Sequence, residues 1–199
     1  MSILGFLGIT SGLSLNLMLQ FGLGIQHIGF DDEDRERPYE FPVVQGGILF
    51  LSVPFLWFFF VYIMVPLYLG FFGYMLFFPL SVLVCMGFEA AVNYFFPQAL
   101  PQAKAFTPQS AYNGLIPAAL VMSFCLASSL MEVMILSLGF CGGVLLAILI
   151  LKEIQKSSSL EAVPAFLRGL PLTLISMGLL SLIFSAIGVV FIKFGGLYR

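Results

Sequence analysis

The sequence predicts an all-α integral membrane protein with about six transmembrane helices in one membrane domain, residues 1–199. Hydrophobic residues make up 60% of the chain and charged residues only 9%, and the mean hydropathy is +1.08. Soluble domains carry roughly 25% charged residues, so a water-soluble core of this size could not hide so much apolar surface. Lipid hydrocarbon must therefore solvate much of the chain.

Six apolar segments separated by polar stretches account for this composition. An α-helix rises about 1.5 Å per residue, so about 20 apolar residues span the hydrocarbon. We expect segments at about residues 3–30, 43–65, 68–96, 111–128, 130–151 and 170–194. The second, third, fifth and sixth of these meet the required length. The longer connecting loops are predicted at 31–40, 97–110 and 152–168, and a tight turn is predicted at Pro66.

The first and fourth segments are predicted to be broken helices. The first segment is interrupted by Gly8, Gly12, Gly22, Gly24 and Gly29, and the fourth by Asn113, Gly114 and Pro117. The two segments occupy corresponding positions if the chain divides into halves of three segments. Paired breaks of this kind are typical of two inverted repeats, here approximately 1–96 and 111–199. The alternative is that Gly and Pro are simply frequent in membrane helices.

Positive charges predict the orientation of the chain, because Lys and Arg concentrate in cytoplasmic loops. The loops after the first, third and fifth segments lie on one face of the membrane and hold Arg35, Arg37, Lys104, Lys152, Lys156 and Arg168. The opposite face would hold only Lys193 and Arg199. These loops are therefore predicted to be cytoplasmic, and both termini are predicted to lie outside the cytoplasm.

Four polar side chains within the apolar segments are candidate functional residues. Ionisable residues at membrane depth are costly and usually have a role. Glu89 is a candidate proton or cation site, or else a snorkelling or helix-pairing carboxylate. Glu132 lies near a helix start, where a carboxylate interacts well with the helix dipole, and a transport role is the alternative. Asn16 and Asn113 lie in the broken segments, where side-chain amides can satisfy freed backbone groups.

Several function classes find no support in the sequence. The acidic run at 31–34 is interpreted as a solvated loop or a docking site for a partner subunit, and no basic cluster of the nucleic-acid-binding kind is present. Cys85, Cys125 and Cys141 are far apart in apolar sequence, which favours buried free thiols over a disulfide. No catalytic motif and no His/Cys ligand cluster is present. No cleavable signal peptide is evident in the first 30 residues.

The string Val163-Pro164-Ala165-Phe166-Leu167-Arg168-Gly169 resembles the last loop of the RnfA/NqrE family. These proteins are membrane subunits of the Rnf electron-transport complex and of the sodium-pumping NADH:quinone reductase. The resemblance continues into the family's last helix at Leu174-Ile175 and at residues 178–182. Weaker matches of apolar positions extend it over essentially the whole chain, at the Asn16 region, Pro66-Leu67, Phe88-Glu89 and Gly139-Phe140.

The resemblance implies a specific architecture and function. The family has six helices in two inverted halves and pairs with an opposite-facing paralogue, RnfE/NqrD. Each paralogue brings one cysteine from each of its two broken helices, and the four thiolates hold a [2Fe-2S] cluster within the bacterial inner (cytoplasmic) membrane. The cluster passes electrons across the bilayer, coupled to movement of Na⁺ or H⁺. The outward termini predicted here match the A-type subunit.

The chain departs from the family at both cluster-ligand positions. The first corresponds to Gln26, after Leu23-Gly24-Ile25, and the second corresponds to Gly114, after Asn113. A neutral amide is a poor iron ligand beside thiolate, and glycine has no ligand atom. Cys125 lies twelve residues after Asn113, roughly 18 Å along a helix, and does not replace the missing thiolate.

We therefore expect a membrane subunit of an Rnf- or Nqr-type complex for which no cofactor is assigned. Three hypotheses remain open. The chain is a cluster-free subunit that keeps the scaffold and assembly role, or a partner supplies the ligands, or the chain is a small ion transporter with the same inverted-repeat fold. The first is the expectation that the substitutions at Gln26 and Gly114 favour.

Overall fold

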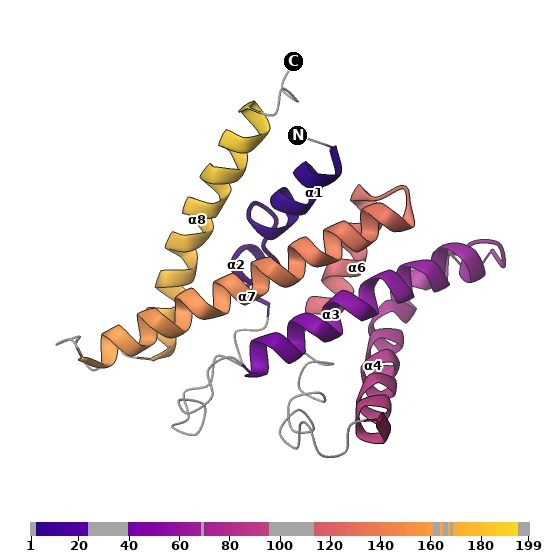
Figure 1. The fold of residues 1–199 in the computed structure, drawn as a ribbon, viewed down its shortest axis with the longest axis horizontal. Coiled ribbons are helices and arrows are strands. Elements are labelled where there is room, and N and C mark those ends of the chain that lie inside the picture. Colours follow the sequence, from indigo (N-terminus) through magenta and orange to yellow (C-terminus); the bar gives the residue numbers. More distant parts are fainter. Residues whose placement is uncertain are drawn as a thin grey trace.

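The computed structural model describes residues 3–23, 40–68, 70–95, 114–160, 164, 167 and 169–194. Within these residues every regular element is helical, which confirms the predicted all-α class. The elements in chain order (Figure 1) are α1 (Ile3–Gly12), α2 (Leu17–Phe21), α3 (Glu40–Phe59), the π-helical η3 (Phe60–Met64), α4 (Gly70–Phe95), α6 (Leu115–Leu126), α7 (Leu130–Leu160) and α8 (Leu170–Phe194).

Three of the described helices are long and apolar enough to cross a membrane. The qualifying stretches are Gly46–Met64, Leu130–Ser158 and Leu170–Phe191. Shorter apolar stretches cover Leu7–Phe21, Met75–Phe88 and Leu115–Leu126, the second of these within the 26-residue helix α4. Together these six stretches fit a membrane bundle.

Helices α3 and α7 form the centre of the bundle and run side by side in opposite directions (Figure 1). The Cys141 side chain packs directly on Gly46, since a Cβ added at Gly46 would lie only 2.7 Å from the Cys141 Sγ. Helix α1 packs against α7, and α6 packs against α3. Helix α8 lies at the periphery, where leucines such as Leu179 and Leu182 are exposed. Such an apolar outer surface suits contact with lipid rather than with water.

The turn predicted at Pro66 is confirmed. Helix α3 continues through the π-turn η3, and residues 65–68 then form a turn in which the backbone N–H of Tyr68 donates to the carbonyl of Val65 at 3.1 Å. Tyr68 has a φ of 58°, in the left-handed region that side chains with a Cβ rarely adopt. This turn reverses the chain and directs α4 back along α3.

The predicted loop at 152–168 begins too early. Helix α7 runs to Leu160 rather than ending at 151, so Lys152 and Lys156 are helical. An α-helix satisfies its own backbone and needs no apolar side chains to continue beyond the hydrocarbon. A contact with α8 also holds the extension, because the Gln155 Nε2 donates to the Thr173 Oγ1 at 2.9 Å. Likewise α3 begins at Glu40, slightly before the predicted start at 43.

Candidate functional site: two chain breaks that meet

The first predicted segment is broken between α1 and α2, and Asn16 occupies the break. The Asn16 side chain is almost completely buried, with 1% of its surface exposed. Its Oδ1 accepts from the backbone N–H groups of Met18 and Leu19 at 3.1 and 3.2 Å, which caps α2. Its Nδ2 donates to the carbonyls of Gly12, at 3.2 Å, and Gly143, at 2.7 Å. One amide thus satisfies backbone groups on both sides of the break and on α7.

The end of α2 meets the start of α6. Helix α2 ends at Gly22, whose φ of 66° is left-handed and whose N–H donates to the carbonyl of Met18 at 3.0 Å. Gly114, immediately before α6, is also left-handed, with a φ of 73°. A Cβ added at Gly114 would lie 3.4 Å from the Cδ2 of Leu23. The end of α2 and the start of α6 are therefore neighbours in space.

Glycines let α1 cross α7 at backbone contact distance. A Cβ added at Gly12 would lie 2.8 Å from the carbonyl oxygen of Gly139, and a Cβ at Gly143 would collide with the Gly12 carbonyl. A Cβ at Gly139 would collide with the Ser11 Oγ. The sequence analysis missed this contact, although Gly8/Gly12 and Gly139/Gly143 show the four-residue spacing of small residues that is typical of close membrane-helix pairs. The crossing holds the broken first segment against the long helix α7.

Aromatic side chains fix α6 on the other side of the break. The Phe124 ring packs against Phe60, with ring centroids 4.7 Å apart, and stacks on Phe77 at 5.3 Å. Trp57 lies 6.4 Å from Phe124 in a stacked arrangement. These rings join α3, η3, α4 and α6, and pairs with such offset geometry add about 0.5–1.5 kcal/mol each beyond simple burial. These contacts hold the far end of α6, roughly 15 Å along the helix from Gly114.

The two predicted carboxylates lie at different positions along their helices. Glu132 lies in the first turn of α7, and its Oε2 accepts from the backbone N–H of Ser128 at 2.7 Å. The Glu132 N–H donates to the Ser129 Oγ at 3.4 Å, so the two side chains cap the helix start reciprocally. Glu89 lies in α4, directly after its apolar stretch Met75–Phe88 and six residues before Phe95, roughly 9 Å from the helix end.

The donor atoms at the described break do not fit an iron–sulfur cluster. Gly114 offers no side-chain ligand, and Cys125 lies near the far end of α6, roughly 16 Å along the helix. The three thiols are free, and within the described ranges no group of three His, Cys, Asp or Glu side chains could hold a metal ion. The predicted positions Gln26 and Asn113 lie outside the described residues.

No protein-family model and no curated protein matches the chain.

Proposed function

We propose that the chain is an RnfA/NqrE-type membrane subunit of an ion-translocating electron-transport complex. The proposal places it in the bacterial inner (cytoplasmic) membrane, with both termini outside the cytoplasm and with electron transfer coupled to Na⁺ or H⁺ movement. The observation that carries the proposal is the contact between the end of α2, at Leu23, and the start of α6, at Gly114. The family that the sequence resembles uses breaks in its first and fourth helices as its functional centre.

The helix contacts support the inverted repeat that this proposal includes. Helix α3 contacts α4 as α7 contacts α8. The first segment lies on α7 as α6 lies on α3, and α2 contacts α8 as α6 contacts α4. Exchanging the two halves converts each of these contacts into another of them, whereas the contact of α6 with α7 has no comparable counterpart between the first segment and α3. Two inverted repeats related by an axis between α3 and α7 would produce this pattern.

We assign the chain a scaffold role within such a complex rather than a cluster-binding role. The described family-ligand position is Gly114, which has no ligand atom and whose left-handed backbone favours glycine. The break still brings α2 and α6 together, so the surface that the family presents to its RnfE/NqrD-like paralogue is retained. In this role the chain positions the partner subunits and separates the interior of the bundle from lipid. The redox centres belong to the partner subunits.

The decisive experiment purifies the tagged chain from its native membranes in mild detergent. We expect an RnfE/NqrD-like subunit and flavin-bearing subunits to co-elute with it. Elution of the chain alone would overturn the proposal. Iron analysis and EPR on the same material test the scaffold role: a [2Fe-2S] signal that disappears when Cys85, Cys125 or Cys141 is changed to Ser would overturn that role while leaving the subunit assignment intact.

A small ion transporter with the same fold is the second candidate, and Glu89 favours it. This carboxylate adjoins the apolar stretch Met75–Phe88 of α4, where an ionisable group is costly and usually functional. The test compares cation flux into proteoliposomes for Glu89→Gln and Glu132→Gln. Glu132 serves as the matched control because its carboxylate caps a helix. Flux that is lost only in Glu89→Gln supports the transporter, whereas equal flux in both variants and the unchanged chain counts against it.

A further inference from the structure

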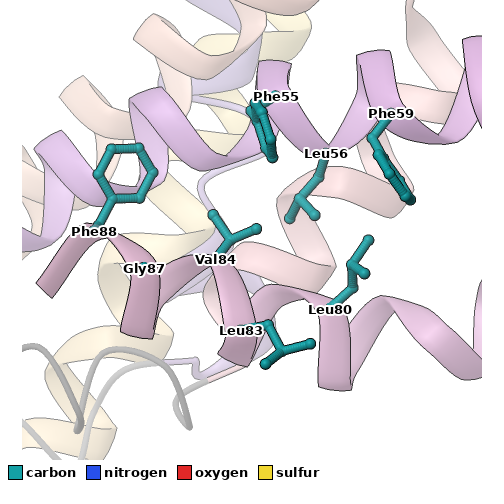
Figure 2. A pocket seen from close by; sticks show the side chains of 8 residues that line it. All are labelled: Phe55, Leu56, Phe59, Leu80, Leu83, Val84, Gly87 and Phe88. Carbon is teal, nitrogen blue, oxygen red and sulfur yellow. The ribbon is translucent and has the colours of Figure 1, made fainter. Parts of the chain in front are cut away.

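Two exposed tyrosines flank helix α4. Tyr68 lies in the turn before α4, two residues ahead of the helix, and 94% of its surface is exposed. Tyr94 lies one residue before the other end of the helix and is 81% exposed. Between the two tyrosines α4 runs beside α3 (Figure 2). The two phenol rings therefore face the surroundings of the bundle at opposite ends of α4.

The spacing of the tyrosines matches the thickness of a bilayer. Helix α4 has 26 residues and is therefore roughly 39 Å long at about 1.5 Å per residue. A tilt of about 20° shortens its projection on the membrane normal to about 37 Å. A bilayer has about 30 Å of hydrocarbon and is about 40–45 Å thick with its headgroup regions. A spanning α4 would therefore place one tyrosine in each headgroup region.

The surface of α4 between the tyrosines is apolar. Every exposed side chain described in α4 before Tyr94 is apolar, and the large ones are Phe72, Met75, Leu76, Phe78, Leu83 and Met86. Tyrosine has an apolar ring and a polar hydroxyl, so it is enriched where hydrocarbon meets water. An apolar surface with one tyrosine at each end is thus the pattern of a helix that spans a bilayer.

The turn at 65–68 has apolar side chains although it is exposed. Val65 is 50% exposed and Leu67 is 60% exposed, and the hydroxyl of Tyr68 is the one polar side-chain group in the turn. Turns that lie in water usually carry polar residues such as Asn, Asp and Ser. The headgroup region accommodates both kinds of group, because apolar side chains there reach the hydrocarbon while the phenol hydroxyl stays hydrated. We propose that Tyr68 and Tyr94 anchor α4 in the two headgroup regions of the bilayer, with the turn at 65–68 immersed in lipid.

This placement fixes the depth of Glu89. Five residues separate Glu89 from Tyr94, roughly 7–8 Å along the helix. Glu89 therefore lies at the edge of the hydrocarbon on the Tyr94 side. A cation that binds there would be met near one surface of the membrane and not at its middle.

Tryptophan fluorescence in bilayers tests the placement on the full chain with any co-purifying subunits. Trp57 is the single tryptophan of the chain and is buried in the bundle, so it gives a constant background. Tyr68→Trp, Tyr94→Trp and Leu83→Trp are each reconstituted into phosphatidylcholine vesicles. The vesicles carry bromine either at a shallow or at a deep position of the acyl chains, and bromine quenches a tryptophan that lies at its own depth.

We expect the shallow bromines to quench Tyr68→Trp and Tyr94→Trp several-fold more strongly than the deep bromines do. Leu83→Trp is the matched control, because Leu83 is also exposed on α4 but lies between the two tyrosines. This control should show the reverse order. Leu67→Trp provides a second reporter in the turn if Tyr68→Trp does not fold.

Three outcomes overturn the proposal. Fluorescence from the turn that iodide in the buffer quenches and bromine does not would place the turn in water. Fluorescence from the turn that neither quencher reaches would mean that a protein covers it. Stronger quenching by the deep bromines would place the turn within the hydrocarbon. Because the inference depends only on how the bilayer surrounds α4, none of these outcomes bears on the proposed role in an electron-transport complex.

Discussion

At the residue scale, Asn16 carries the largest share of the polar interactions at the break. Its amide serves two roles that are usually separate, a helix cap for α2 and a bond to the α7 backbone at Gly143. The sequence predicted that an amide in a broken segment satisfies freed backbone groups. It did not predict α7 as a partner, because nothing in local sequence places position 143 beside position 16.

We predict that Asn16→Ala lowers the unfolding free energy by about 1–3 kcal/mol, since an N-cap is worth about 0.5–2 kcal/mol and an interhelical membrane hydrogen bond about 0.6 kcal/mol. Thermal unfolding in detergent micelles measures the loss. Asn16→Ser is the control: it keeps a capping oxygen but is too short to reach Gly143, so it should lose less. Equal stability of Asn16→Ala and the unchanged chain would contradict the role.

Glu132 gives a second prediction at this scale. Because its carboxylate accepts from the Ser128 N–H, Glu132→Gln keeps an acceptor and should cost no more than about 1 kcal/mol, the loss of favourable interaction with the helix dipole. Glu132→Ala removes the acceptor as well and should cost more. Unfolding of both variants in micelles provides the comparison, and a Glu132→Ala variant as stable as Glu132→Gln would show that the cap contributes nothing.

At the scale of elements, the crossing of α1 over α7 decides where the broken segment lies. Lipid tails are as apolar as leucine, so membrane helices gain little from burying apolar side chains against each other and depend on close packing. Gly12, Gly139 and Gly143 provide that packing by letting backbones touch. The short helices α1 and α2 could not form a stable unit by themselves, so their position follows from α7.

We predict that Gly139→Ala destabilises the protein by about 1–3 kcal/mol, the usual cost of forcing an extra group into a packed contact. The added Cβ would collide with Ser11 and Gly8. Gly142→Ala, three residues further along α7, meets no atom within 4 Å and should instead gain about 0.5–1 kcal/mol of helix propensity. Opposite signs in micelle unfolding support the crossing, and destabilisation by both variants would argue against it.

At the scale of the whole molecule, the start of α1 and the end of α8 lie toward the same end of the bundle (Figure 1). An even number of membrane-spanning segments would produce this arrangement. We propose that the predicted loops at 31–40 and 97–110 and the stretch 152–168 lie in the cytoplasm, because they hold the excess of Lys and Arg.

This orientation predicts the behaviour of fusions to the C-terminus. Alkaline phosphatase folds only outside the cytoplasm, so a fusion after Arg199 should be active, while a green fluorescent protein fusion there should be dark. The same reporters inserted after Gln102, in the predicted loop at 97–110, should give the reverse pattern and serve as the control. An active phosphatase at Gln102 would invert the proposed topology.

The sequence by itself determined the helical class, the approximate segments, the turn at Pro66 and the presence of a break in the first segment. Composition and apolar length carry this information because the bilayer imposes the same length on every spanning helix. The extension of α7 to Leu160 was not predictable by this criterion, since a helix beyond the hydrocarbon no longer needs apolar residues.

Only the tertiary structure decided what the breaks touch. It brought Leu23 against Gly114 and directed the Asn16 amide onto Gly143. Each of these depends on how closely two helices approach, and that distance is set by small residues from distant parts of the chain acting together. A linear pattern contains the glycines but not their pairing, so the candidate site became visible only when the helices were packed.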